Sequence, residues 1–337
     1  MPHTVEIIIP SWNGRKILSQ CLPGMLDCAR EITPAARVTI VDDASTDGTP
    51  EYLRQNSPSV HVVRLTARRG FPGAVNAGIL PSTADLILLV NNDMIPRGPV
   101  LAPLLEHFGD AGVAAVSARV LTWDGARLDV GRRLRTFDRG EIAGVGDNED
   151  YADVSYTFFA SGGAMALDRR KFAELGGFDE IYSPGYVEDT DFSYRAWKRG
   201  WKIAWDPRAT FLHMGSATFA PKSGGLRKLV NLCRVRYLAE RNSFYFYWKN
   251  LTDEKARHDY WKHLPGRAHR ALCRGDAIYL VALIRTIAMH RELSRLQKQE
   301  AALSVLSDFD VFRRLGELCR TSPVHESDPE GAYAQTG

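Results

Sequence analysis

The 337-residue sequence lacks several patterns that mark well-known classes of protein. It has no GxxxxGK[ST] phosphate loop and no GxGxxG after an expected strand, which argues against an NTPase and an NAD-dependent enzyme. Its five cysteines form no C-x-x-C pair, so neither a zinc ribbon nor a disulfide framework is indicated, and a reducing cytosol is expected. The chain does not open with a basic segment followed by an apolar core, so we expect no signal peptide.

Long apolar runs and internal repeats are also missing. The longest apolar stretch of the C-terminal part, residues 277–284, is far shorter than the ~20 residues that span a bilayer. The net charge is only +3, but residues 226–300 hold 16 Lys and Arg against 7 Asp and Glu. This asymmetry suggests an anionic partner surface, and a solvated helical face explains it equally well. We expect no nucleic-acid binding, because the aromatic residues there fall at helical spacing and no groove-reading motif is present.

Short apolar runs alternate with helix-like segments over the first ~120 residues, as in α/β proteins. Residues 119–153, rich in Gly, Arg and Asp, predict a hairpin or a flexible excursion, and TFFASGGAMALD predicts a further strand. The pattern therefore predicts a mostly parallel sheet flanked by helices. The expected strands are residues 5–9, 38–41, 60–65, 85–90 and 113–116, and the expected helices are residues 14–28, 49–55, 73–80 and 99–108.

The chain changes character after Gly225, where long helical segments replace the alternation. We therefore divide it into an α/β domain at residues 1–220, a helical C-terminal region at residues 221–314, and a tail at residues 315–337. The tail has few apolar residues and is expected to be disordered.

Polar residues follow three of the expected strands, at the sheet edge where α/β proteins bind ligands. Adjacent carboxylates at Asp42 and Asp43 repel one another unless a ligand or cation compensates, and one of them could accept hydrogen bonds from a uracil or thymine imide or from a ribose. Asn91, Asn92 and Asp93 end the most hydrophobic strand. Asp93 suits a divalent cation, with Asn91 as a neutral ligand, although Asn and Asp are also common turn residues.

Three further segments carry candidate residues, each with a plainer structural explanation. In RRGFPGAVNAGI, Arg69 and Gly73 stand at a helix start that could contact phosphate groups or could simply form a tight turn. In YVEDTD, Asp189 is a candidate general base; Glu188 and Asp191 are expected to share another helix face, and the helix macrodipole alone could explain these acids. His213, at the end of an expected strand, is either a metal or diphosphate contact or a structural histidine.

Eight stretches in register resemble the family-2 glycosyltransferases, which have the GT-A fold, and most closely the bacterial branch containing rhamnosyltransferases. Together they run from about residue 5 to residue 250. The stretches are IIIPSWNGRKILSQCL, VDDASTDGT, RRGFPGAVNAGI, ADLILLVNNDMIP, SGGAMALDRRKFAELGGFDE, YVEDTDFSYRAWKRGWKI, FLHMGSAT and RNSFYFYWKN.

The resemblance implies roles for individual residues. Asp93 would hold Mg²⁺ or Mn²⁺ as the last Asp of the family's DxD signature, and His213 is similar to a histidine that some relatives use as a further ligand. Asn91 stands where many relatives have Asp, which should weaken metal binding. Asp189 would be the base, supported by Glu188. Pro10, Trp12, Asp42 and Asp43 would line the nucleoside pocket, and Gly162 and Gly163 would let the chain pass close to the acceptor.

The expected reaction is metal-dependent sugar transfer, rhamnose-like, with inversion, from a UDP- or dTDP-sugar to a hydroxyl of a glycan or polyprenyl-diphosphate-linked acceptor. Galactose, N-acetylglucosamine or mannose transfer and a non-catalytic nucleotide-sugar-binding module are the alternatives. The basic region, its FYFYWK cluster and residues 277–284 suggest peripheral binding to an anionic membrane at the cytoplasmic face, and helix packing or a homodimer contact explains them equally well.

Overall fold

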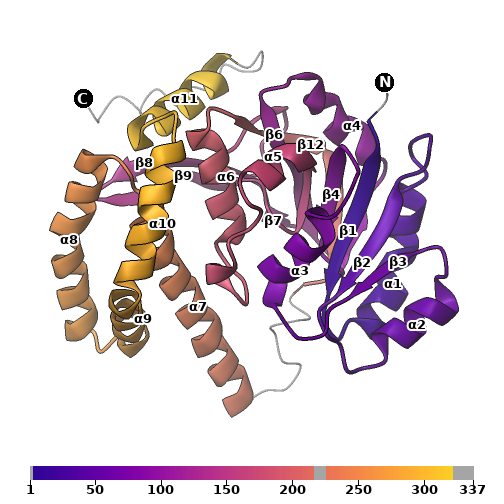
Figure 1. Cartoon of the computed structure of the whole chain (residues 1–337), viewed down its shortest axis with the longest axis horizontal. Helices are drawn as coiled ribbons and strands as arrows, with labels where there is room; N and C mark the ends of the chain where they lie inside the picture. The colour runs from indigo at the N-terminus through magenta and orange to yellow at the C-terminus, as the bar shows by residue number, and fades with distance from the viewer. Residues whose placement is uncertain (1–2, 216–224, 322–337) are drawn as a thin grey trace.

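The computed structural model describes residues 3–215 and 225–321. One large mixed sheet runs in the order β10-β12-β6-β11-β4-β1-β2-β3. Figure 1 shows this sheet on one side of the molecule, the C-terminal helices on the other, and α6 between them. The expected architecture, a mostly parallel sheet flanked by helices with a helical C-terminal region, is confirmed.

The sheet contains two parallel groups joined by an antiparallel strand. Strands β3, β2, β1 and β4 run parallel, as do β6 and β12, whereas β11 is antiparallel to both β4 and β6. The strands are β1 (Val5–Ser11), β2 (Arg37–Asp42), β3 (His61–Arg64), β4 (Leu86–Val90), β5 (Met94–Pro96), β6 (Val113–Thr122), β7 (Leu128–Val130), β8 (Arg132–Asp138), β9 (Glu141–Glu149), β10 (Ser155–Tyr156), β11 (Ala164–Asp168) and β12 (Lys202–His213).

Alternation along the strands builds a core on each face of the sheet. In β1, Ile7 and Ile9 pack with α1, α2 and α4, whereas Ile8 packs on the opposite face with α3, α5 and α6. The helices are α1 (Arg15–Cys28), α2 (Thr49–Asn56), α3 (Gly70–Ile79), α4 (Leu101–Glu106), α5 (Arg169–Glu174), α6 (Glu188–Lys198), α7 (Leu226–Asn250), α8 (Glu254–Cys273), α9 (Ala277–Ala288), α10 (His290–Leu303) and α11 (Asp308–Thr321), with short 3₁₀ turns η1 (His107–Gly109) and η2 (Glu180–Tyr182).

The segment predicted as a hairpin or excursion contains one, since β8 and β9 pair antiparallel as a separate two-stranded sheet. Its tip packs on the C-terminal helices: a Cβ on Gly140 would lie 2.4 Å from the Cα of Tyr260. The strand predicted in TFFASGGAMALD covers only its second half, Ala164–Asp168, which pairs with β4 and, over residues 165–167, with β6. Residues 157–163 are outside the strand, and Ser161, Gly162 and Gly163 among them line the site.

The helical region extends beyond the predicted boundary at residue 314. Helix α11 continues to Thr321, and Leu315 and Val311 are fully buried in the core that also contains Ile8, on the sheet face covered by α3, α5 and α6. An amphipathic helix that buries an apolar face in this way is stabilised by packing. The rest of the predicted tail, residues 322–337, lies outside the described residues.

Candidate active site

A cleft of about 400 Å³ lies at the carboxyl edge of the sheet. Strands β1, β2, β4 and β12 all end there, so the polar residues that follow them meet. Segments before α3 and α6 close the other side. The predicted residues that line the cleft are Pro10, Trp12, Asp43, Asn91, Asn92, Asp93, Gly162, Gly163, Glu188, Asp189 and His213.

Three predicted site residues, Asp42, Arg69 and Gly73, do not line this cleft. Side chains alternate along an extended chain, so Asp42 points away from Asp43 and lies fully buried with Arg64 Nε 3.7 Å from its carboxylate. The guanidinium of Arg69 is ion-paired with Glu180 instead. Gly73 lies inside α3, where a Cβ would come within 2.5 Å of the Cβ of Arg69, so close packing accounts for this glycine.

The start of α3 is attached to the sheet by Asp43. Its carboxylate accepts hydrogen bonds from the backbone N–H of Arg69 at 2.7 Å and of Gly70 at 2.9 Å. The guanidinium of Arg68 lies 3.4 Å from the centroid of the Trp12 ring and 4.0 Å from Asp43. This part of the cleft therefore offers an aromatic face, a cation and a carboxylate side by side, which suits a nucleotide base with its ribose.

A histidine–carboxylate pair forms the opposite wall. Strand β5 pairs with β12 so that Met94 lies opposite His213, which places the imidazole next to Asp93. His213 Nε2 is 3.1 Å from Asp93 Oδ2, and His213 Nδ1 is 2.5 Å from Asp129 Oδ2. Burial lowers the pKa of His213, but the hydrogen bonds and charges of Asp93 and Asp129 outweigh it and raise that pKa to about 9.

This pair fits a hard divalent cation. Asp93 Oδ1 is buried without a hydrogen-bond partner, so it keeps a lone pair for a ligand. Ligands at right angles on an ion with bonds of ~2.1 Å lie about 3 Å apart, which matches the separation of His213 and Asp93. Among the described residues, no group of three or more His, Cys, Asp or Glu could hold a metal. Any ion here would need further oxygen ligands from phosphate or water.

Two acidic side chains at the start of α6 face the cleft. Asp189 Oδ2 accepts from the backbone N–H of Gly162 at 3.0 Å, and Oδ1 accepts from that of Thr190 at 2.6 Å. Burial raises the pKa of Asp189, and these hydrogen bonds offset the shift only in part. Burial, followed by the charge of Asp189, raises the pKa of Glu188 well above its usual range, and Glu188 Oε2 has no partner. Buried acids with raised pKa values in a cleft are candidates for proton transfer.

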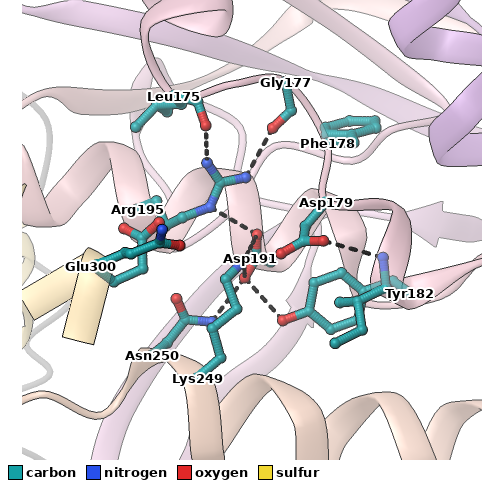
Figure 2. A network of polar contacts seen from close by, with 12 residues as sticks. Leu175, Gly177, Phe178, Asp179, Tyr182, Asp191, Arg195, Lys249, Asn250 and Glu300 are labelled. Carbon is teal, nitrogen blue, oxygen red and sulfur yellow. Dashed lines mark hydrogen bonds and ion pairs between the residues drawn. The ribbon is translucent and has the colours of Figure 1, made fainter. Parts of the chain in front are cut away.

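Glu188 and Asp191, expected to share one face of the helix, have different surroundings. Both Glu188 and Asp189 line the cleft, whereas Asp191 is fully buried and bonded to Arg195, Lys249 and Asn250. The reason lies in the partners of Asp191, because Arg195 on the next turn of α6 and Lys249 on α7 hold its carboxylate in the interior. Figure 2 shows these groups converging on the Asp191 carboxylate.

Asp129 and Tyr186 also line the cleft, and no sequence pattern predicted them. Asp129 gave no local signal, because β7 joins the cleft only by pairing with the end of β6. Tyr186 and Val187 have φ values of 75° and 76°, which non-glycine residues rarely adopt. Two strained residues immediately before Glu188 are a feature of the backbone that no residue pattern announces.

The sequence matches the family described as "Glycosyl transferase family 2" over residues 6–176. An N-acetylglucosaminyl-diphospho-decaprenol L-rhamnosyltransferase of Mycobacterium tuberculosis is 27% identical over 205 residues, covering 52% of this chain and 66% of that protein. An undecaprenyl-phosphate mannosyltransferase of Micrococcus luteus is 28% identical over 210 residues, covering 59% of this chain and 80% of that protein. The chain thus spans just under two thirds of the rhamnosyltransferase.

Solved structures show the same fold at lower identity. A mannosyltransferase of Pyrobaculum calidifontis in complex with GDP-Man and Mn²⁺ superposes with a TM-score of 0.55 at 20% identity, covering 90% of this chain and 87% of that chain. GalNAc-T7 with UDP, GalNAc and Mn²⁺ gives a TM-score of 0.53 at 19% identity, covering 73% and 50%. Within residues 3–215 and 225–321, no helix has the length and apolar character needed to cross a bilayer.

Proposed function

The chain belongs to glycosyl transferase family 2, and on that premise we propose that it transfers a sugar from a UDP- or dTDP-sugar to an acceptor hydroxyl with inversion. The observation that carries this proposal is one cleft holding two different kinds of carboxylate. Asp93, beside His213, keeps an oxygen for a cation, and Asp189 is half-buried with a raised pKa. A cation bound at Asp93 would suit a diphosphate leaving group, and Asp189 suits the role of proton acceptor.

Asp189 is the base in this proposal. It takes the proton of the acceptor hydroxyl as the hydroxyl oxygen forms a bond to the anomeric carbon. The bond from that carbon to the diphosphate oxygen breaks in the same step, so the nucleoside diphosphate leaves with the electron pair and the configuration inverts. A divalent cation, held by Asp93 and His213 with Asn91 nearby, would neutralise the leaving diphosphate. Glu188 remains beside the base as a buried acid.

The donor nucleoside would lie at the other end of the cleft. Trp12 and Arg68 form a stacked pair there, and Asp43 attaches the start of α3 beneath them. Gly163 permits a close approach, because a Cβ at this position would lie 2.8 Å from Met94 Cε and 3.1 Å from the amide nitrogen of Asn91. Rhamnose is the favoured sugar because of the rhamnosyltransferase relative, and mannose is the second candidate because of the mannosyltransferase relative.

The proposed acceptor is a glycan or a polyprenyl-diphosphate-linked sugar, reached from the cytoplasmic face of a membrane. Helix α9 exposes Val281, Ile284 and Ile287, and the basic side chains of Arg274 and Arg285 are exposed on the same helical region. Apolar side chains with basic neighbours suit the surface of an anionic bilayer. The FYFYWK cluster plays no part in this surface, because Phe244, Tyr245 and Phe246 are buried in the protein interior.

A nucleotide panel tests the donor site. Thermal unfolding is followed with UDP, dTDP and GDP, each with and without Mn²⁺. A nucleotide at 100 times its Kd adds about 2.7 kcal/mol to the free energy of unfolding, so the preferred base gives the largest shift, and Mn²⁺ should increase that shift. Transfer to a polyprenyl-diphosphate-linked acceptor, with the anomeric configuration of the product read by NMR, then tests the reaction. Absence of any nucleotide shift would rule out the donor site, and retention of configuration would rule out direct displacement.

Vesicle sedimentation tests the membrane surface. We expect binding to anionic vesicles that weakens with salt, and weaker binding for Ile284→Glu than for the matched control Leu303→Glu, an exposed leucine on α10. A homodimer that buries α9 would instead appear as a protein-concentration-dependent mass that Ile284→Glu reduces. Equal vesicle binding by the two variants would contradict the membrane assignment.

A further inference from the structure

Helix α7 holds both flanks of the segment that carries the two cleft-facing acids. We propose that Asn242, in the helical C-terminal region, is a positioning residue that fixes the backbone of residues 182–187 and thereby orients Glu188 and Asp189 toward the acceptor. The inference rests on the proposed function for its catalytic consequence, and its structural part stands on the contacts of Asn242 alone.

Asn242 is fully buried, and its amide nitrogen donates hydrogen bonds to backbone carbonyl oxygens of this segment. Nδ2 lies 2.8 Å from the carbonyl oxygen of Tyr182, 2.9 Å from that of Gly185 and 2.8 Å from that of Tyr186. An amide has two N–H groups, so the three carbonyls share two donors. One side chain therefore ties down both ends of a five-residue stretch.

The orientation of this amide is set by its neighbour. Arg241 donates to Asn242 Oδ1 from Nε at 2.9 Å and from Nη2 at 2.7 Å, so the oxygen faces the guanidinium and the nitrogen faces the carbonyls. Arg241 Nη2 also donates to the carbonyl oxygen of Ser183 at 2.7 Å. Two successive residues of α7 thus bind four carbonyl oxygens between Tyr182 and Tyr186.

The segment needs such support because its backbone is strained. Tyr186 and Val187 both have φ near +75°, and each residue held in that region costs about 1–3 kcal/mol. Strain of this kind persists only where the surroundings determine the conformation. Val187 immediately precedes Glu188 and is the N-cap residue of α6, so relaxation of its backbone would rotate the first turn of that helix.

The other flank of the acids is anchored by the same helix. Lys249 follows Asn242 by two helical turns and therefore lies on the same face of α7. Its Nζ lies 2.8 and 3.0 Å from the two oxygens of Asp191, and Asn250 Nδ2 donates to Asp191 Oδ1 at 2.7 Å. Figure 2 shows Lys249 and Asn250 reaching Asp191 together. Side chains of α7 thus bind the chain on both sides of Glu188 and Asp189.

A purely structural role would also bury Asn242, so the test needs a matched control. Asp308 is equally buried and holds the opposite end of α6, accepting from Lys198 Nζ and from the hydroxyl of Tyr194, each at 2.7 Å. Asn242→Ala and Asp308→Asn both remove buried hydrogen bonds to the region of α6, but only the first touches the segment before Glu188. A misplacement of ~1 Å costs about 10²-fold in rate.

We expect kcat to fall about 10²-fold in Asn242→Ala while the Kd of the preferred nucleotide stays within about 2-fold, with Asn242→Ser, which keeps one donor, falling between. The pH profile of kcat should move too. Loosening admits water to Asp189, whose neighbours are Glu188 on α6 and Arg133 on β8, so its pKa should fall toward the ordinary value. Asp308→Asn, at equal loss of Tm, should keep kcat and the pH profile. Activity losses that simply follow Tm in all variants would overturn the proposal.

Hydrogen exchange gives a readout that does not depend on the reaction. The backbone N–H groups of residues 183 and 185–191 should exchange faster in Asn242→Ala and Asn242→Ser than in the wild-type chain. In Asp308→Asn their exchange should be unchanged. Unchanged exchange in the Asn242 variants would contradict the positioning role even if the chain is an active glycosyltransferase. Faster exchange in a chain that neither binds nucleotides nor transfers sugar would leave the positioning intact and remove only the proposed function.

Discussion

The first turn of α6 carries acids in two opposite environments only a few residues apart. Glu188 and Asp189 face the cleft, and burial raises both of their pKa values. Asp191 is fully buried, yet the charges and hydrogen bonds of Arg195, Lys249 and Asn250 outweigh burial and hold its pKa well below the usual range. Asp189 accepts hydrogen bonds from backbone N–H groups, whereas the partners of Asp191 include two buried cations, Arg195 and Lys249.

The difference shows that the helix macrodipole, which acts on all three acids, does not decide their charge. Direct partners do, because an opposite charge within a few ångströms in a buried site outweighs the desolvation of the carboxylate. The two environments also divide two tasks. Asp191 contributes stability, whereas the cleft-facing acids keep raised pKa values that suit proton transfer but cost stability.

The largest expected effect comes from removing the charge of the proposed base. Asp189→Asn keeps an oxygen for the backbone N–H of Gly162, so the fold and the nucleotide Kd should persist while kcat falls by about 10²–10⁴-fold. Steady-state kinetics, with a thermal-shift measurement of nucleotide binding, checks this. A variant with near-normal kcat would remove Asp189 from the mechanism.

The same Asp-to-Asn substitution at Asp191 should lower the stability of the fold. Asp191→Asn leaves the buried Arg195 without its ion-pair partner and leaves Lys249 paired with Asp179 alone, which should cost about 3–5 kcal/mol in the free energy of unfolding measured with urea. Because the folded pKa of Asp191 is depressed, its contribution is present above the unfolded value of ~3.9 and is lost as pH falls through the folded value. The surface control Glu174→Gln should change stability little, and a similar loss there would remove the contrast.

A third test concerns Asp93, another cleft-facing carboxylate with an oxygen that has no hydrogen-bond partner. Asp93→Asn should weaken Mn²⁺ binding by about 10-fold or more, since loss even of a supporting partner of a metal ligand costs 10–100-fold. Calorimetric titration of the unliganded protein with Mn²⁺ measures the effect directly. Asp150→Asn, which removes an exposed acid paired with Arg119, is the control. Equal affinities in the two variants would place the cation elsewhere.

The last prediction is a gain in the free energy of unfolding, for Glu188→Gln. The folded pKa of Glu188 is raised, so its stabilising contribution is fully present below the unfolded value of ~4.3 and is lost as pH rises through the folded value. Glu188→Gln cannot ionise, so relative to wild type it should gain stability with pH, at up to ~1.4 kcal/mol per unit between those two values. An unpaired buried amide offsets part of this gain. Urea unfolding at pH 4, 6 and 8 shows the trend, and a difference independent of pH would mean that Glu188 does not titrate as described.

Most of the sheet, and much of the cleft, could be predicted from the residues. Apolar runs closed by polar residues located β1, β2 and β4, and parallel strands necessarily bring Trp12, Asp43 and Asp93 to one edge. The antiparallel insertion of β11 could not be read in this way, because a short apolar run carries no information on strand direction. The FYFYWK cluster was equally ambiguous, since aromatic residues serve a core and a membrane surface alike.

The sequence by itself determined which acids stand at the ends of strands and helices, because hydrophobic periodicity and capping are local properties of the chain. Only the tertiary structure decided which of these acids is neutralised. Lys249 lies 58 positions after Asp191, and Asp129 lies 84 positions before His213. The charge of a buried carboxylate depends on the partners that packing brings within about 4 Å, and apart from Arg195, four residues after Asp191 on the same helix, no local pattern around Glu188, Asp189 or Asp191 specifies those partners.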